Sequence, residues 1–281
     1  MLFHLLRVQQ WYKNILIFLP LVFAGLITDI HSIFLTLLGF LALCLMSSTN
    51  YILNDIVDRE KDNIHPEKKF RPIASGKVSI MMAGLVASLL AILSLGIGIL
   101  LSEAFFFILL AFFFLTQLYS LYFKKEPFLD LIFISVNFVL RAISGIYILS
   151  VRLSPWLLVC TFFLSLFIVV GKRKADLAFL GKDAEKHKEN LALYSSQITN
   201  TLMIIATVSL LLSYTLYSFL SIYPQLMYSI PFALYVILYY FFLVESKSPI
   251  ARKPELFYTD KRLCTGIFLW IMTVLLLMYF L

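Results

Sequence analysis

Long apolar runs recur along this chain, and most of them approach the roughly 20 residues that a helix needs to cross the hydrocarbon core of a bilayer. Nine such runs cover residues 15–28, 33–53, 79–101, 104–122, 128–149, 155–171, 198–220, 226–243 and 263–281. The polar stretches between them are too short to fold as a separate soluble domain. The pattern therefore predicts an all-α polytopic membrane protein, with about nine transmembrane helices in a single domain over residues 1–281.

The composition excludes an ordinary soluble domain, because 61% of the residues are hydrophobic and only 14% are charged. Arg7 and Lys13 precede the first apolar run, and no small-residue cleavage site follows them. We therefore expect a retained first helix rather than a signal peptide. Cys44, Cys160 and Cys264 show no metal-binding spacing, so we expect them to be inert packing residues.

Most basic residues fall on one side of the predicted helices. Short hairpins at 29–32, 102–103, 150–154 and 221–225 alternate with longer, charged connections at 54–78, 123–127, 172–197 and 244–262. Of the 23 Lys and Arg residues, only Arg141 and Arg152 lie outside these longer connections and the N-terminal stretch. By the positive-inside rule this side is cytoplasmic, which predicts a multi-pass protein of the inner membrane whose site faces the cytoplasm. The net charge of +7 thus reflects topology and does not indicate a nucleic-acid partner.

The most unusual charge pattern follows the second apolar run, where Asp55, Asp58 and Asp62 lie close together. If the helix of that run continues outward, Asn50, Asn54, Asp58 and Asp62 recur every four residues and share one face. Carboxylates stacked in this way repel each other unless a cation lies between them. Hard oxygen ligands at this spacing suit Mg²⁺ held together with a substrate diphosphate. The alternative is a solvated cytoplasmic loop of ordinary mixed charge.

Polar residues also occur inside the fifth run, where Asp130, Asn137 and Arg141 share one helical face. Arg141 lies roughly 18–20 Å along the helix axis, where facing lipid unpaired would be costly. We therefore expect Arg141 to point into the bundle and to pair with a carboxylate or with a bound phosphate. Gly145 and Gly171 are candidates for positions of close helix packing.

A second charged cluster follows the sixth run, with Lys172, Arg173 and Lys174 in sequence and Asp176 four residues after Lys172. Such a basic cluster could bind anionic lipid headgroups, or it could bind substrate phosphate. The stretch 175–194 is amphipathic and could form a short interfacial helix.

These residues resemble the UbiA superfamily of intramembrane prenyltransferases. The motif N-D-x-x-D-x-x-x-D stands at Asn54, Asp55, Asp58 and Asp62, at the end of the second of nine expected helices. Further motifs resemble the decaprenyl-phosphate phosphoribosyltransferase branch of that superfamily. They are Q-W-Y-K-N at 10–14, H-P-x-K-x-x-R-P-I-A-S-G at 65–76, F-V-L-R-A-I-S-G at 138–145, L-S-P-W at 153–156 and G-K-R-K-A-D-L at 171–177. The resemblance extends over residues 7–263, although Val8 and Gln9 differ from the R-P-R-Q-W opening of the branch.

The resemblance implies transfer of 5-phosphoribose from phosphoribosyl diphosphate to a polyprenyl phosphate of the bilayer, with Mg²⁺ and with release of diphosphate. It implies that Asp55, Asp58 and Asp62 are catalytic and hold the metal. The residues expected to bind substrate are Lys13, Asn14, Asn50, Asn54, Arg71, Lys124, Arg141, Lys172, Arg173 and Asp176. No particular oligomeric state is indicated.

One motif separates this branch from the aromatic prenyltransferases of the same superfamily. Those enzymes usually carry a second D-x-x-x-D motif, whereas this chain has Lys172-x-x-x-Asp176. One acidic and one basic motif suit a donor with a metal-bound diphosphate and a separate phosphate. Two other functions stay open: an aromatic prenyltransferase that uses a polyprenyl diphosphate, and a transporter of an anionic metabolite or lipid.

Overall fold

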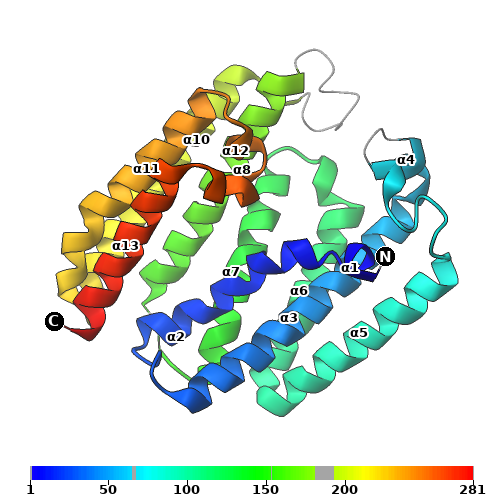
Figure 1. Cartoon of the computed structure of the whole chain (residues 1–281), viewed down its shortest axis with the longest axis horizontal. Coiled ribbons are helices and arrows are strands. Elements are labelled where there is room, and N and C mark those ends of the chain that lie inside the picture. Colours follow the sequence, from blue (N-terminus) through cyan, green and yellow to red (C-terminus); the bar gives the residue numbers. More distant parts are fainter. Residues whose placement is uncertain (1, 65–67, 153, 181–192, 281) are drawn as a thin grey trace. The chain divides into compact units, whose positions relative to one another are not determined.

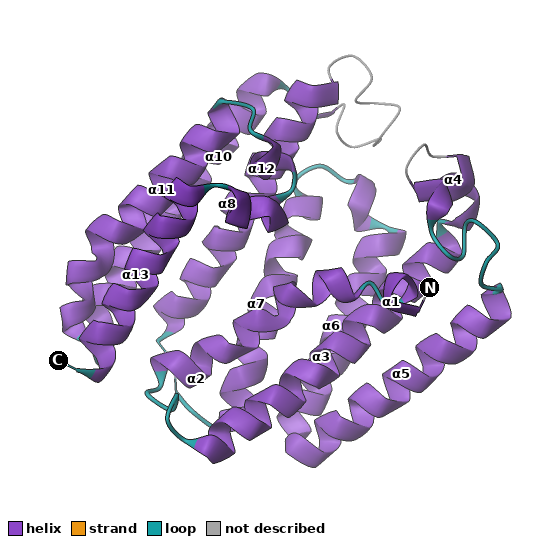
Figure 2. Cartoon of the chain, viewed as in Figure 1, coloured by secondary structure: helices purple, strands orange, loops and turns teal. Residues whose placement is uncertain are grey.

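The structure is a computed structural model that describes residues 2–64, 68–152, 154–180 and 193–280. Every regular element in these ranges is an α-helix or a 3₁₀ helix (Figure 1). Figure 2 shows the same arrangement, with loops between helices and no strand in the described part of the chain. The prediction of an all-α protein is confirmed.

The chain forms two compact units: unit 1 holds Met1–Tyr122 and Leu140–Arg152, and unit 2 holds Phe123–Val139 and Leu153–Leu281. The elements of unit 1 are α1 (Leu2–Leu5), η1 (Val8–Phe18), α2 (Leu19–Phe23), α3 (Ile30–Val57), α4 (Arg59–Ile64), η2 (Lys68–Phe70), α5 (Ile80–Leu101) and α6 (Glu103–Leu121). Those of unit 2 are η3 (Phe123–Lys125), α8 (Pro155–Leu180), α10 (Ser196–Leu220), η6 (Pro224–Ser229), α11 (Ile230–Glu245), α12 (Pro249–Arg252), η7 (Pro254–Thr259) and α13 (Lys261–Tyr279). Helix α7 (Leu129–Leu149) is divided between the two units. A single domain over residues 1–281 stays a prediction.

Eight segments in the described ranges are long and apolar enough to cross a membrane. They are Ile30–Val57, Ile80–Leu101, Glu103–Leu121, Leu129–Leu149, Pro155–Phe179, Ser196–Leu220, Pro224–Glu245 and Lys261–Tyr279. Each of them overlaps one of the last eight runs expected from the sequence.

The first expected run, 15–28, takes a different form. In its place η1 and α2 continue from Val8 to Phe23. At about 2.0 Å per residue in a 3₁₀ helix and 1.5 Å in an α-helix, this segment extends roughly 30 Å, close to the thickness of a bilayer core. The apolar pattern places the start too late because Lys13 and Asn14 interrupt it, and Asn14 is buried.

Helix α3 is the element of unit 1 that positions the acidic motif, and it contacts η1, α5 and α6. In Figure 1, η1 crosses over α3. The carboxylate of Asp29 caps the start of α3 by accepting the backbone N–H groups of His31 at 3.3 Å and Ser32 at 3.0 Å. Ser94 on α5 donates its hydroxyl to the backbone oxygen of Ala42 at 2.8 Å, which fixes the contact between α3 and α5.

Two glycines mark places where helices approach closely. A Cβ atom at Gly145 on α7 would lie 2.2 Å from the backbone oxygen of Ile17 and 2.9 Å from Cγ of Pro20. A Cβ atom at Gly171 on α8 would lie 3.0 Å from Cγ2 of Val244 on α11. The expectation that Gly145 and Gly171 allow close packing is confirmed.

The substitution Gly145→Ala should lower the free energy of unfolding by about 1–3 kcal/mol, because a backbone oxygen cannot move aside as a flexible side chain can. Gly84→Ala on α5 is the matched control, since no atom lies within 4 Å of a Cβ at that position. Thermal unfolding of both variants in the same detergent measures the difference. Equal stability of the two variants would contradict the packing described for α7.

In unit 2, α8 packs against α10, and α11 packs against α13. Phe167, Met203 and Leu210 are among the buried residues of the core that these helices share. This frame carries the second charged motif at the C-terminal end of α8.

Candidate functional site

The acidic motif lies at the end of α3, where the helix is interrupted. Asp58 is the C-cap residue of α3, and α4 begins at Arg59. The sequence pattern assumed instead that one helix continues outward through Asp62. Asp55 and Asp62 are buried, while Asn54 and Asp58 are partly buried. The two buried acids therefore belong to different helices of unit 1.

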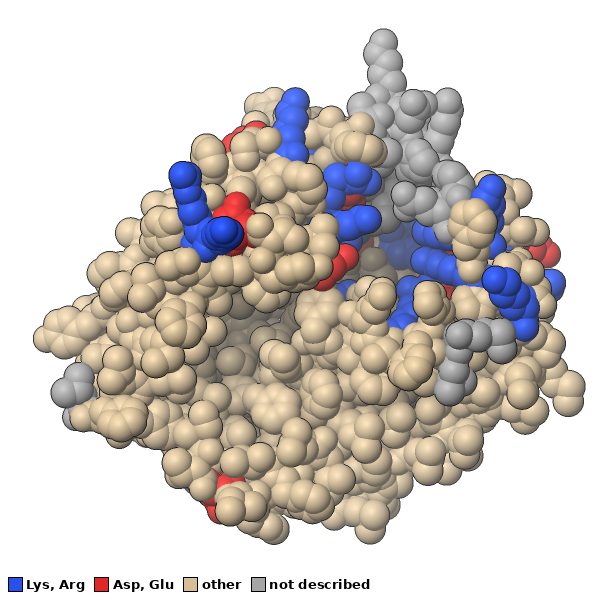
Figure 3. All heavy atoms as spheres, viewed as in Figure 1, with Lys and Arg blue, Asp and Glu red and all other residues tan. Residues whose placement is uncertain are grey.

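Arg71 binds both of these buried carboxylates. Its Nη1 atom lies 3.0 Å from Oδ1 of Asp55 and also donates to Oδ2 of Asp62. Arg7 donates to the same oxygen of Asp55, and Nζ of Lys68 lies 3.8 Å from Oδ1 of Asp62. Figure 3 shows Lys and Arg side chains gathered around α4 and the segment that follows it. The two carboxylates thus share one positive charge, which offsets their mutual repulsion.

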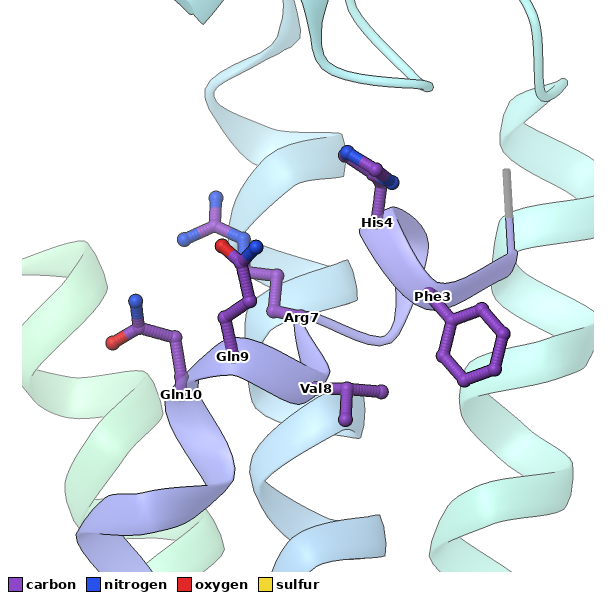
Figure 4. Close-up of a pocket in the computed structure, with 6 residues that line it drawn as sticks. All are labelled: Phe3, His4, Arg7, Val8, Gln9 and Gln10. Atoms are coloured by element: carbon purple, nitrogen blue, oxygen red, sulfur yellow. The ribbon is translucent and has the colours of Figure 1, made fainter.

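Arg7 was not among the residues predicted for the site. Its backbone is left-handed, with φ 49° and ψ 45°, a conformation that costs a non-glycine residue about 1–3 kcal/mol. A cavity of about 420 Å³ lies beside it, lined by Phe3, His4, Arg7, Val8, Gln9 and Gln10. In the view of Figure 4 the polar ends of Arg7, Gln9 and Gln10 point to one side of the segment, and Phe3 and Val8 point to the other. The sequence feature that could have indicated Arg7 is its position as a cation in the N-terminal stretch, where the resemblance begins.

Tyr51 brings three cations together on the part of α3 that also carries Asp55. The Tyr51 hydroxyl lies within electrostatic reach of Lys13, Arg141 and Arg7, and Lys13 is also its hydrogen-bond partner. The guanidinium carbon of Arg7 lies 5.0 Å from the centre of the Tyr51 ring. Because residues four apart share a helix face, this group lies one turn from Asp55. No sequence signal marked Tyr51, since a tyrosine in an apolar run is typical of packing.

Arg141 is buried in unit 1, in agreement with the prediction that it points away from lipid. Its Nε atom donates to Oδ1 of Asn14 at 2.8 Å, and its guanidinium carbon lies 4.7 Å from the centre of the Phe112 ring. The amide nitrogen of Asn14 lies 3.3 Å from both Sγ of Cys44 and Oγ of Ser47. Asn14 therefore orients Arg141.

Asn50 offers a hydrogen-bond donor inside unit 1. Its Oδ1 atom accepts a hydrogen bond from Nε2 of Gln117 at 2.7 Å. Its Nδ2 atom is buried and has no hydrogen-bond partner among the described residues. Leaving a buried amide unsatisfied costs about 1–3 kcal/mol, so a bound ligand oxygen or an ordered water would stabilise this group.

Arg173 is held inside unit 2 by a buried acid. Its Nε and Nη2 atoms lie 3.1 and 2.7 Å from Oδ2 of Asp130. The Tyr194 hydroxyl donates to Oδ1 of Asp130 at 2.7 Å and accepts the backbone N–H of Phe128 at 2.7 Å. Burial raises the pKa of Tyr194, so this hydroxyl keeps its proton at neutral pH. The arrangement favours a structural role for Arg173, and its binding of substrate stays a prediction.

The substitution Tyr194→Phe should lower the free energy of unfolding by about 1–2 kcal/mol, because Asp130 loses a hydrogen bond in a buried setting. Tyr258→Phe is the matched control, since the Tyr258 side chain is 66% exposed. Thermal unfolding measures both changes. A Tyr194→Phe variant with unchanged stability would mean that the hydroxyl contributes nothing to holding the Asp130–Arg173 pair.

The other expected substrate residues of unit 2 lie around the end of α8. Lys172 and Asp176 are both partly buried and one turn apart, and Lys124 is partly buried in η3. Nε of Arg252 on α12 lies 3.3 Å from Oδ1 of Asp176, and the Arg252 guanidinium carbon is 3.7 Å from the centre of the Phe179 ring. The spacing of the sequence suggested no role for Arg252.

Two of the segments singled out in the sequence extend beyond the described residues. The expected interfacial helix at 175–194 is described only up to Leu180, where it continues α8, and again from residue 193. Residues 181–192 lie outside the described residues, as do residues 65–67 of the H-P-x-K motif. The interfacial helix stays a prediction.

The acidic motif of unit 1 supplies carboxylate oxygens, the kind of ligand that suits a magnesium ion held together with a phosphorylated substrate. No three His, Cys, Asp or Glu side chains of the described ranges are arranged to hold a metal ion. Asp55 and Asp62 are both bound by Arg71, so two carboxylates lie close together. In proteins Mg²⁺ is usually held by one or two carboxylates, and substrate phosphates supply further oxygen ligands. The assignment of Asp55, Asp58 and Asp62 as metal ligands stays a prediction.

The sequence profile of the UbiA prenyltransferase family matches residues 16–270. The chain belongs to this family. A relative named decaprenyl-phosphate phosphoribosyltransferase, from Mycolicibacterium smegmatis, is 31% identical over 98% of this chain and 91% of its own length. An uncharacterized protein of Sinorhizobium fredii, y4nM, is 34% identical over 61% of this chain, and the match spans only 33% of that relative.

Among solved structures, a UbiA homolog from Archaeoglobus fulgidus bound to GPP and Mg²⁺ matches with a TM-score of 0.75 and 19% identity. The match covers 97% of this chain and 98% of the homolog, so the two share the UbiA fold. The predicted resemblance to the UbiA superfamily and to decaprenyl-phosphate phosphoribosyltransferases is confirmed. This UbiA protein is a transferase and a multi-pass membrane protein.

Proposed function

We propose that this UbiA protein transfers 5-phosphoribose from phosphoribosyl diphosphate to a polyprenyl phosphate of the bilayer and releases diphosphate, with Mg²⁺ as cofactor. The relative from Mycolicibacterium smegmatis, which is named for this activity on decaprenyl phosphate, supports the proposal because its similarity extends over 98% of the chain. The site in unit 1 supports it independently through its charges.

The observation that carries the proposal is the mixture of cations and acids at one end of α3. Arg7, Lys13 and Arg141 lie within electrostatic reach of Tyr51, and Asp55 lies one turn away. Phosphoribosyl diphosphate has a diphosphate at one end and a separate phosphate at the other. Carboxylates suit the metal-bound diphosphate, and Arg and Lys side chains suit the phosphate that is bound directly.

Two further residues of unit 1 fit a substrate with many oxygen acceptors. The buried Nδ2 atom of Asn50 can donate to a diphosphate oxygen, which would satisfy it. Arg71 lies between the two buried carboxylates, and its guanidinium can also interact with the diphosphate. Asn14 contributes by orienting Arg141.

The proposed transfer of phosphoribose depends more on stabilisation of negative charge than on proton transfer. The bond between ribose C1 and the diphosphate oxygen breaks, and diphosphate leaves with the electron pair. An oxygen of the polyprenyl phosphate forms the new bond to C1 from the opposite face, so the configuration at C1 inverts. Arg7 and Arg71 stabilise the negative charge that grows on the leaving diphosphate. The acceptor phosphate is already anionic at neutral pH, so no general base is required.

Asp55, Asp58 and Asp62 would hold the Mg²⁺ ion. When bound, the ion supplies Lewis-acid stabilisation of the diphosphate. The protein's own contribution is to keep the three carboxylates at the junction of α3 and α4 while Asn50 and Asn54 orient the substrate.

We also propose that the longer, charged connections of the sequence face the cytoplasm from an inner membrane. The support is the distribution of basic residues, of which only Arg141 and Arg152 lie outside the long connections and the N-terminal stretch. Phosphoribosyl diphosphate and Mg²⁺ would then reach the site from the cytoplasm, and the polyprenyl phosphate would reach it from the bilayer.

The test is to identify the lipid product by mass spectrometry. Purified protein in detergent receives Mg²⁺, phosphoribosyl diphosphate and a polyprenyl phosphate, and a second reaction receives a polyprenyl diphosphate and an aromatic acid. We expect a phosphoribosylated polyprenyl phosphate from the first reaction and no product from the second. A prenylated aromatic acid from the second reaction alone would overturn the proposal and would mean that the Lys172-x-x-x-Asp176 motif does not exclude aromatic prenylation.

A further inference from the structure

A groove on unit 2 lies between α11 and α13, and none of its lining residues belongs to the Lys172-x-x-x-Asp176 motif. These two helices pack side by side (Figure 1), and both belong to segments apolar and long enough to cross a membrane. The groove has a volume of about 490 Å³. Phe232 and Tyr235 line it from α11, and Leu269 lines it from α13. These three side chains are 38%, 47% and 45% exposed, so the groove is open to the surroundings of the helix pair.

Gly266 allows the aromatic wall of this groove to approach α13 closely. A Cβ atom at this position would lie 2.8 and 2.9 Å from two carbons of the Tyr235 ring. Because Gly266 has no side chain, the ring of Tyr235 lies directly against α13. The Tyr235 ring also stacks on Tyr239, with centroids 5.7 Å apart and an angle of 13° between the ring planes. The aromatic wall is therefore fixed by contacts within unit 2.

The groove changes from charged to apolar along α13. Lys261 and Arg262, both exposed, line it at the start of the helix, and Leu269 lines it eight residues further on. Eight residues correspond to about 12 Å along the helix axis. Asp260 is also close, but its carboxylate accepts the backbone N–H groups of Arg262 and Leu263 at 2.9 Å. The charges of Lys261, Arg262 and Asp260 therefore sum to one positive charge at this end of the groove.

We propose that this groove binds one anionic phospholipid of the bilayer, with its phosphodiester on Lys261 and Arg262 and an acyl chain along Phe232, Tyr235 and Leu269. Charge complementarity and the position of the groove in the bilayer both favour this lipid. The start of a transmembrane helix lies at the depth of the lipid headgroups, where each Lys or Arg attracts anionic lipid. The apolar part of the groove follows the direction in which an acyl chain extends from its headgroup. The single net positive charge at the start of α13 matches the single negative charge of one phosphodiester.

Native mass spectrometry of the whole protein tests this, with phosphatidylglycerol as the anionic probe and phosphatidylcholine of the same acyl chains as the neutral one. We expect tighter binding of phosphatidylglycerol to the unmodified protein. The double variant Lys261→Gln/Arg262→Gln should bind phosphatidylglycerol about tenfold more weakly. The double variant Lys247→Gln/Lys253→Gln is the matched control, because it removes two exposed positive charges of unit 2 outside the groove.

A steric variant tests the apolar part of the groove separately. Thr265 is exposed and lines the groove, so Thr265→Trp fills it without changing charge or core. This variant should also lose the preference for phosphatidylglycerol, and it decides the question if the Gln double variant does not fold. Unchanged binding in Thr265→Trp or in a folded groove double variant, or an equal loss in the control, would overturn the proposal. Stronger binding of a polyprenyl phosphate than of phosphatidylglycerol would overturn it as well.

Discussion

Replacing Asp58 by Asn is expected to lower the rate of diphosphate release by a factor of about 100 to 1,000, while the protein stays folded. Asp58 is partly buried at the junction of α3 and α4, and Asn keeps its size and its capacity to cap the helix. The negative charge is lost, and with it one ligand expected to hold Mg²⁺ on the diphosphate. Loss of one preorganised electrostatic contact to a transition state typically costs a factor of this size. Steady-state release of diphosphate by purified protein measures the effect.

Glu60→Gln is the matched control for Asp58→Asn. Glu60 lies two residues further along, is exposed on α4 and loses the same charge. Its turnover should stay within about twofold of the unmodified protein, because exposed charges at the surface are screened. If both variants retain normal turnover at normal protein level, the acidic motif is not the catalytic site. If both lose it equally, the effect is one of general charge on α4 and not of Asp58.

The second large effect is expected at Arg141. Arg141→Gln should lower kcat/KM for phosphoribosyl diphosphate by a factor of about 10 to 100, since a hydrogen bond to a charged group is worth about 1.5–3 kcal/mol. Arg141→Lys should retain part of this activity, because it keeps the charge while losing the Nε contact to Asn14. Initial rates at varied donor concentration measure the change.

Arg152→Gln is the matched control for Arg141. Arg152 is exposed and belongs to the same unit, on the hairpin that follows α7. Its kcat/KM should not change. A thermal unfolding midpoint close to that of the unmodified protein shows that Arg141→Gln is folded. A folded Arg141→Gln variant with normal kcat/KM would remove Arg141 from the substrate site and leave it with a role in packing against Phe112.

The features of the candidate site that could be predicted from the sequence are those that depend only on a residue and its near neighbours in the chain. The apolar run before Asn54 and the charges after it place the acidic motif at a helix end without any knowledge of the fold. Arg141 is buried as expected, because the cost of exposing a charge to lipid depends only on its position in the run. The close approach at Gly145 follows from its small size in a membrane helix.

The parts that were missed depend on contacts between distant segments. Arg7 and Tyr51 meet through the crossing of η1 over α3, which no spacing encodes. Arg173 is bound by Asp130, which lies 43 residues earlier in the sequence. A cation that the sequence motif predicts to bind phosphate is therefore held in a buried ion pair. The first expected run starts later than the helical segment of η1 and α2, because Lys13 and Asn14 are polar residues within that segment and not its end.

The most direct test of the central claim is the release of diphosphate by the detergent-purified protein, measured with each component left out in turn. We expect release only when phosphoribosyl diphosphate, a polyprenyl phosphate and Mg²⁺ are all present, and loss of release when the metal is removed with a chelator. Turnover that needs a polyprenyl diphosphate in place of phosphoribosyl diphosphate would contradict phosphoribosyl transfer. Undiminished release after chelation would contradict the role given to Asp55, Asp58 and Asp62.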